Sequence, residues 1–167
     1  MTTKWETVHR RTALLNDVVA QLNEGMADLP WTEELAAEFE NPDALLVALH
    51  DVWTRGLEGR IHLGLEMDDD GDLTETVADA WRFTAERLPG VRRILDLNAT
   101  AAVLRHAERA EHQMIAVAAG LAAFGDPVTR TVQLGQTFVT GLRAQGLSAR
   151  RVIRQPLVTR LKEAFAS

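Results

Sequence analysis

The sequence has 167 residues, a net charge of -6 and no cysteine, which excludes disulfides, thiolate metal sites and a cysteine nucleophile. It contains no run of about 18 apolar residues, and residues 1–15 carry charges where a signal peptide needs an apolar core. We therefore expect a cytoplasmic protein that does not enter a membrane.

Charge is divided unevenly along the chain. Residues 1–86 carry 19 acids and 6 bases, whereas residues 87–167 carry 5 acids and 12 bases. Such asymmetry can mark an anion-binding tail, or it can bring complementary halves together within one chain or across a dimer. We favour the second interpretation, because helices that must pack together gain from opposite charge.

Apolar residues recur at three- and four-residue steps through nearly the whole chain, which is the spacing of amphipathic helices. The first helix begins within the first three residues and weakens at Gly25. A short second helix begins at Thr32. Asn41 can then cap a third helix whose first position is Pro42. This third segment, DALLVALHDVWTRGLEGRIHLGLEM, continues for about seven turns.

After an acidic loop, an apolar stripe over residues 73–88 predicts a fourth helix that Pro89-Gly90 ends. The next segment is VRRILDLN. A bend at Asn98 would separate it from the alanine-rich ATAAVLRHAERAEHQMIAVAAGLAAF, which also has helical spacing.

The last part of the chain predicts two more helices. Asp126 is expected to cap one that Gly146 ends, and residues 148–167 form a basic C-terminal tail helix that restarts at Pro156. Alternation at period two appears nowhere for long. We therefore predict that residues 1–167 are all-α: a single-domain helical bundle with four long helices and two or three short ones.

The acidic loop EMDDDGDLTETV, residues 66–77, shares some features with a calcium loop. With Gly71 at the sixth position of an EF-hand loop, acids occupy positions one, three, five and seven. The twelfth position should be a bidentate Glu but is Val77, and Glu75 comes two residues too early. We expect a turn in which Asp72 caps the following helix and a cation binds weakly at most.

Polar residues on apolar helix faces are the candidates for a functional site. On the third helix, Arg60 projects with Leu49 and Trp53, close to three glycines that would let another helix approach: 56, 59 and 64. A buried guanidinium needs a carboxylate or an anion, because an unpaired buried charge is costly. The acid with the complementary helical phase is Glu111.

Glu111 falls inside the apolar stripe of the alanine-rich helix, with Glu108 and His112 at its margin. Two interpretations follow. The preferred one is a buried Arg60–Glu111 ion pair that fixes the helix register. The alternative is a small polar pocket for an anionic or hydrogen-bonding ligand, with these candidate ligand-binding residues: Arg60, Glu108, Glu111 and His112.

Other polar and aromatic residues receive less specific predictions. His50 and His106 lie at borders of helix faces, where histidines are more often exposed or hydrogen-bonded than functional. The four tryptophans are expected in core and rim packing. One column with metal-ligand spacing lies on the polar face of its helix: Glu58, His62 and Glu66. The paired Glu-x-x-His motifs of di-iron bundles are missing, so no metal site or cofactor is predicted.

The motifs of common enzymes are also missing from the sequence. It contains no G-x-G-x-x-G, P-loop, H-E-x-x-H or G-x-S-x-G, and its two serines are Ser148 and Ser167. No catalytic residue is predicted. Nucleic-acid binders combine basic clusters with overall positive charge or aromatic platforms, whereas this chain is acidic and its basic tail has one aromatic residue, Phe165. The tail is expected to dock one apolar edge on the bundle or on a neighbouring subunit: Leu157, Leu161 and Phe165.

These observations favour a non-enzymatic helical protein that acts through protein–protein contacts, as a homodimer that salt dissociates. The alternative is a small-molecule-binding bundle with a polar pocket around Arg60 and Glu111, which could be an enzyme. A weaker alternative is binding of anions or nucleic acid by the basic tail.

Overall fold

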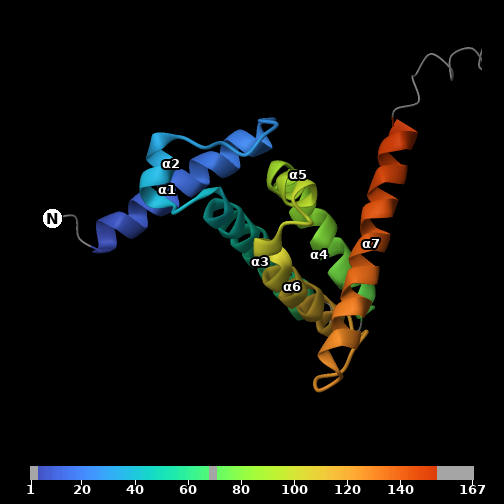
Figure 1. Ribbon diagram of the computed structural model, residues 1–167. Coiled ribbons are helices and arrows are strands. Elements are labelled where there is room, and N and C mark those ends of the chain that lie inside the picture. The colour runs from blue at the N-terminus through green and yellow to red at the C-terminus, as the bar shows by residue number, and fades with distance from the viewer. Residues whose placement is uncertain (1–3, 68–70, 154–167) are drawn as a thin grey trace, which may run out of the picture.

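The structure is a computed structural model that describes residues 4–67 and 71–153, with side chains described for residues 5–67 and 71–146. These ranges contain helices and no strand, which confirms the all-α prediction (Figure 1). None of the described helices is long and apolar enough to cross a membrane. The elements are α1 Lys4–Asn23, α2 Glu33–Glu38, α3 Pro42–Met67, α4 Leu73–Arg87, α5 Pro89–Leu97, the 3₁₀ helix η1 Ala102–Leu104, α6 Arg105–Ala118 and α7 Val128–Ile153.

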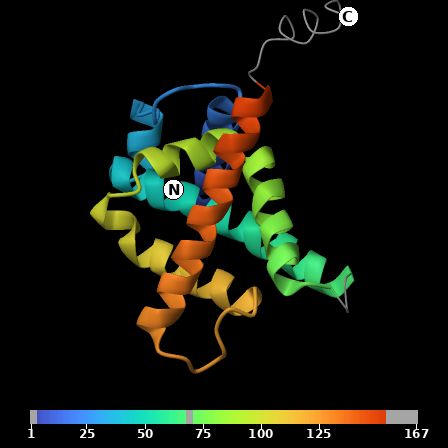
Figure 2. The same cartoon turned by 90° about the vertical axis from the view of Figure 1, so that its right-hand side faces the viewer.

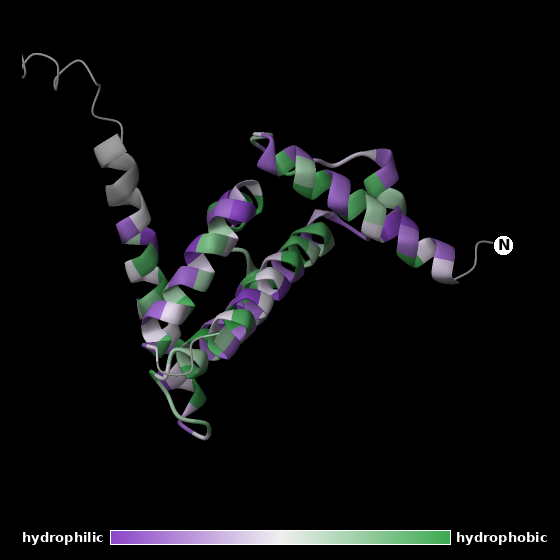
Figure 3. Cartoon of the chain, turned by 180° about the vertical axis from the view of Figure 1, so that it is seen from behind, coloured by the Kyte–Doolittle hydropathy of each residue, from purple (hydrophilic) through white to green (hydrophobic). Residues whose placement is uncertain are grey.

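The helix α3 is the central element and packs against α1, α4, α5, η1 and α6. Its deepest side chains recur every four residues and are inaccessible to solvent: Leu45, Leu49, Trp53 and Leu57. This spacing keeps them on one face of the helix. The other helices also carry an apolar face and a polar face (Figure 3). α7 packs against α6, and in the view turned by 90° it passes beside α4 (Figure 2).

Local sequence signals set several helix starts where they were predicted. The Asn41 carboxamide oxygen accepts from the Ala44 N–H at 2.9 Å, and α3 begins at Pro42. The Asp72 carboxylate accepts from the backbone N–H of Thr74 at 2.8 Å and caps α4. That half of the acidic loop is therefore a helix cap, as predicted. Residues 68–70, which the calcium hypothesis also needs, lie outside the described residues.

Three helix boundaries differ from the sequence predictions. The alanine-rich segment is helical only over η1 and α6, and Gly120 then takes a positive φ of 69° that α-helix cannot accommodate. Asp126 does not cap α7. Its carboxylate accepts instead from the Ala123 N–H at 2.8 Å, within the preceding turn. α7 also continues through Gly146 to Ile153. The predicted restart at Pro156 lies outside the described residues.

Glycines bring two pairs of helix backbones into close contact. A Cβ atom on Gly135 of α7 would lie 1.8 Å from the carbonyl oxygen of His112 in α6, and one on Gly90 of α5 would lie 2.0 Å from that of Leu22 in α1. Glycine is required at both positions, because a backbone carbonyl cannot move aside like a side chain. Gly59, which the sequence analysis expected to let another helix approach, has nothing within 4 Å of such an atom, and neither does Gly141 of α7.

We predict that Gly135→Ala lowers the free energy of unfolding by about 1–3 kcal/mol, because overpacking at α6 outweighs alanine's helix propensity. Gly141→Ala is the matched control on the same helix and should gain up to about 1 kcal/mol. Chemical denaturation of both variants measures the difference. Equal effects of the two substitutions would show that α6 and α7 do not meet at Gly135.

Candidate functional site

The structure separates the two residues that the sequence analysis paired. The Arg60 guanidinium lies 4.1 Å from the centre of the Phe83 ring in α4, a cation–π contact. Glu111 is buried, as its position in an apolar stripe indicated, but contacts other groups. The predicted ion pair between Arg60 and Glu111 is therefore wrong. Arg60 shares a face of α3 with Trp53 but lies two turns further along the helix, where its guanidinium meets Phe83 of α4 instead of Glu111.

Glu111 is held by two side chains of α3. The Trp53 indole N–H donates to Oε1 of Glu111 at 3.0 Å. His50 Nε2 lies 2.9 Å from Oε2 of the same carboxylate, and both side chains are almost fully buried. Oε1 therefore accepts a hydrogen bond from α3, and Oε2 lies in ion-pair contact with an imidazole nitrogen of the same helix, which offsets the cost of burying the carboxylate.

His50 also connects the carboxylate to a hydroxyl group. Its Nδ1 lies 3.2 Å from Oγ1 of Thr54, one turn further along α3. In the tautomer that carries its proton on Nε2, on the side of the carboxylate, Nδ1 accepts from the Thr54 hydroxyl. The oxygen of Thr54 then keeps its lone pairs for a further donor. Thr54, His50 and Glu111 thus form a row of hydroxyl, imidazole and carboxylate.

A second polar group lies behind Trp53. The Arg92 guanidinium of α5 lies 4.6 Å from the Trp53 ring centre, and its Nε and Nη2 both donate to Oδ1 of Asp96, at 3.0 and 2.9 Å. Arg143 of α7 reaches the same oxygen with Nη2 at 2.9 Å. One carboxylate therefore joins α5 to α7. Arg92 adds a positive charge on the Trp53 side of Glu111.

The charges around Glu111 keep it ionised. Burial acts to raise the pKa of its carboxyl, but the contact with His50, the charge of Arg92 and the Trp53 N–H outweigh burial and hold that pKa below its ordinary value. For Glu108 and His112, burial changes the pKa more than the neighbouring charges do. It raises the pKa of Glu108 and lowers that of His112.

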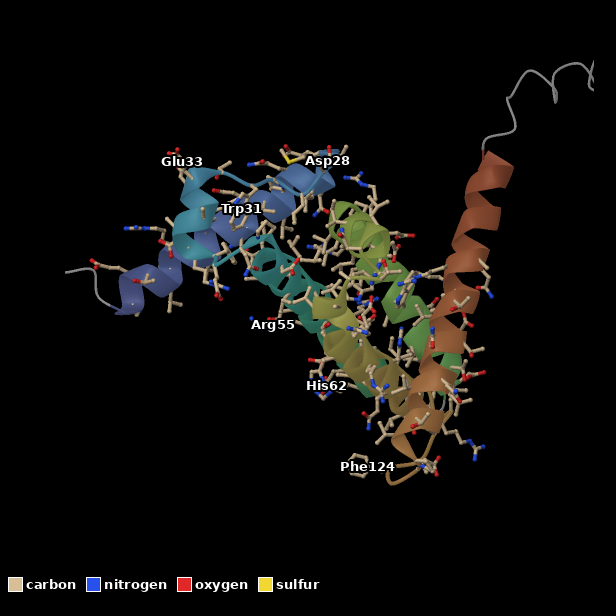
Figure 4. All side chains as sticks on the ribbon, in the orientation of Figure 1. Asp28, Trp31, Glu33, Arg55, His62 and Phe124 are labelled. Atoms are coloured by element: carbon tan, nitrogen blue, oxygen red, sulfur yellow. The ribbon has the colours of Figure 1, made fainter. Side chains whose placement is uncertain are left out.

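A pocket of about 270 Å³ opens between α3 and α6 over this row of groups. Polar groups from both helices reach it, and its remaining wall is apolar. The lining residues are His50, Asp51, Thr54, Arg55 and Glu58 of α3, with Ala107, Ala110, Glu111 and Met114 of α6. Arg55 lies on the outer side of the paired helices, away from α7 (Figure 4).

Of the four predicted ligand-binding residues, Glu111 lines this pocket. Arg60, Glu108 and His112 are not among its lining residues. The structure thus places the candidate site at the middle of α3. Whether any of the four binds a ligand stays a prediction.

Sequence reasoning missed most of the partners of Glu111. His50 was placed at the border of a helix face, yet it is buried. The available signal was its spacing from Trp53 and Thr54, three and four residues away, because such residues share a helix face. The i,i+4 spacing of Arg92 and Asp96 in a short apolar helix was a similar signal.

The column on the polar face of α3 lies in solvent, as predicted. His62 Nε2 contacts Oε1 of Glu66 at 3.1 Å, and both side chains are mostly exposed. Within the part of the chain that the structure describes, no three His, Cys, Asp or Glu side chains gather closely enough to hold a metal ion. Figure 4 shows His62 on the same outer side as Arg55.

No protein family model matches this sequence, and no curated protein or solved structure matches it either. Its function must therefore be argued from the site.

We predict that Glu111→Gln lowers the free energy of unfolding at pH 7 by about 1.5–3 kcal/mol, the contribution of hydrogen bonds to a charged group. Because the native pKa of Glu111 is depressed, its ionised form stabilises the fold at pH values above its ordinary pKa of 4.5. That contribution is lost as the pH falls through the native pKa. Denaturation curves of both proteins from pH 7 to acid should converge. A pH-independent difference would show that the charge of Glu111 is unimportant.

Double-mutant cycles test the corrected contacts. We expect His50→Ala and Glu111→Gln to couple by about 0.5–3 kcal/mol, because the two side chains touch. Arg60→Ala and Glu111→Gln should add within about 0.5 kcal/mol, since these residues share no partner. Urea denaturation gives all the values. Strong coupling between Arg60 and Glu111 would show that the two side chains do form the ion pair predicted from the sequence.

Proposed function

We propose that the protein binds a small organic cation in the pocket between α3 and α6. The observation that carries the proposal is an ionised carboxylate, Glu111, buried at the floor of a pocket with apolar walls. Concave sites with a few convergent polar groups and perturbed ionisable residues are typical of ligand-binding sites.

The charges of the pocket favour a cation. Three acids line it, namely Asp51, Glu58 and Glu111, against one obligate cation, Arg55. Thr54 supplies an additional acceptor, because its proton is directed at His50. An ammonium group has three donors and no acceptor, which matches this set of acceptors.

The size and walls of the pocket restrict the rest of the ligand. A volume of about 270 Å³ is slightly below the usual range for drug-sized ligands. Ala107, Ala110 and Met114 provide apolar contact, and a methionine adapts readily to the shape of a ligand. The proposed ligand is therefore a compact amine with an apolar body.

Thermal unfolding in the presence of small amines tests this proposal. The probes are cyclohexylamine, butylamine and putrescine, each compared with the corresponding neutral alcohol. An amine at 100 times its Kd should stabilise the protein by about 2.7 kcal/mol, a rise in Tm of about 5–10 °C. The alcohols should have no such effect. A panel in which amines and alcohols behave alike would contradict the proposal.

Variants locate the effect without disturbing the buried carboxylate. Ala110→Leu fills the pocket from α6 and should abolish the amine response. Ala37→Leu, on exposed α2, is its matched control and should respond like the wild type. Asp51→Asn and Glu58→Gln, both at exposed positions, should weaken amine binding while leaving the Tm of the free protein unchanged.

Homodimerisation and action through protein–protein contacts stay separate proposals. They do not depend on the pocket.

A further inference from the structure

One end of the bundle exposes a group of apolar side chains. It is formed by the start of α4, the turn between α6 and α7, and the start of α7. Phe124 is 97% exposed and projects away from the body of the protein (Figure 4). We call this group the apolar end; it consists of Leu73, Leu121, Phe124 and Val128, all exposed.

These side chains belong to one local surface. A Cβ atom on Gly120 would lie 3.3 Å from Cδ1 of Leu73, and the Thr74 hydroxyl reaches the Ala119 carbonyl at 3.4 Å. These contacts tie the start of α4 to the turn after α6. Exposed apolar side chains that cluster mark interaction sites, whereas apolar side chains exposed singly are common on protein surfaces.

The apolar end has an acidic border. Asp72 and Glu75 lie in the first turn of α4, and Asp126 lies in the turn before α7. One base, Arg130, lies nearby in the first turn of α7. The ligand of this surface should therefore combine apolar side chains with positive charge.

Residues 154–167 have that composition. They carry Arg154, Arg160 and Lys162 against one acid, Glu163. Their apolar residues Leu157, Leu161 and Phe165 recur every four residues, so a helix would present them on one face. This segment is outside the described residues, and its sequence matches the apolar end in both apolarity and charge.

The same chain cannot deliver this segment to its own apolar end as a helix. The apolar end lies at the start of α7, and the segment follows the other end of that helix (Figure 1). The 26 residues of α7 span about 39 Å, whereas 14 helical residues span about 21 Å. A fully extended segment would cover the distance, but the N–H and C=O groups of its backbone would then lack the partners that a helix gives them.

We propose that residues 154–167 of one copy dock as an amphipathic helix on the apolar end of a second copy. Two copies then exchange these segments around a two-fold axis, so that the same contact forms twice. Most ion pairs between described side chains lie within one half of the chain, with His50–Glu111 as an exception. The charge difference between the halves is thus available for contacts between copies.

Disulfide crosslinking tests which copy receives the segment. The natural chain has no cysteine, so introduced thiols are the only ones. We would introduce Ala123→Cys beside Phe124 and Ala164→Cys in the segment, in the same full-length chain. The expected product of mild oxidation is a covalent dimer on a denaturing gel. Ala37→Cys with Ala164→Cys is the control and should crosslink poorly. A purely intramolecular disulfide, or none, overturns the proposal.

Sedimentation measures the contribution of each surface. Phe124→Ser should raise the Kd of the dimer by about 30-fold or more, the effect of losing a hot-spot residue. Leu97→Ser, an equally simple change at an exposed leucine of α5, should leave it unchanged. Circular dichroism confirms that both variants fold. A monomeric natural chain at high concentration and low salt, or equal effects of the two substitutions, overturns the proposal.

Mixing two defective proteins separates exchange from other modes of association. A Phe124→Ser chain keeps an intact C-terminal segment, and a Leu157→Ser/Leu161→Ser chain keeps an intact apolar end. The mixture should form a heterodimer with one of the two contacts, more stable than either variant alone. A mixture no more stable than its components contradicts segment exchange. The amine response of the pocket should persist in all these variants, so a failure here leaves the pocket proposal intact.

Discussion

The buried carboxylate of Glu111 is the constraint on which the core depends. An ionised group in an apolar core is tolerated only when its oxygens have donors and a compensating charge is near. α3 supplies the Trp53 donor and the His50 contact, and α5 supplies the charge, through Arg92. Three helices must therefore meet in one arrangement for this single acid to be satisfied, which specifies how they pack.

Helix periodicity predicted the elements and the burial of Glu111, but not its partners. The apolar stripes and the caps at Asn41 and Asp72 act locally, and local signals are readable from sequence. The phase of Arg60 was also readable, and it does share a face with Trp53. Periodicity gives the direction of a side chain, whereas the crossing of α3 by α6 and α4 decides which turn meets which helix. That crossing depends on contacts distant in sequence, such as Trp53 with Glu111 and Arg60 with Phe83.

The same limit explains why the sequence did not indicate the other residues that line the pocket beside Glu111. Its polar groups come from the turn of α3 that faces α6, and its closing wall comes from small residues of α6 that could equally have packed against another helix. A sequence shows that Ala107 and Ala110 permit close approach, but not which helix approaches. Charged residues that face solvent on an isolated helix, such as Asp51 and Glu58, become the rim of a site only once α6 is placed beside them.

The pocket and the apolar end are linked through α6. Glu111 and Met114 line the pocket in the middle of this helix, and Leu121 and Phe124 follow its end. Between them, the backbone of His112 is fixed against Gly135 of α7. A shift of α6 along its axis would therefore strain this contact and act on α7, because closely packed interiors transmit strain. The apolar end is the surface that such a movement would displace, since it lies on both sides of the turn that joins these two helices.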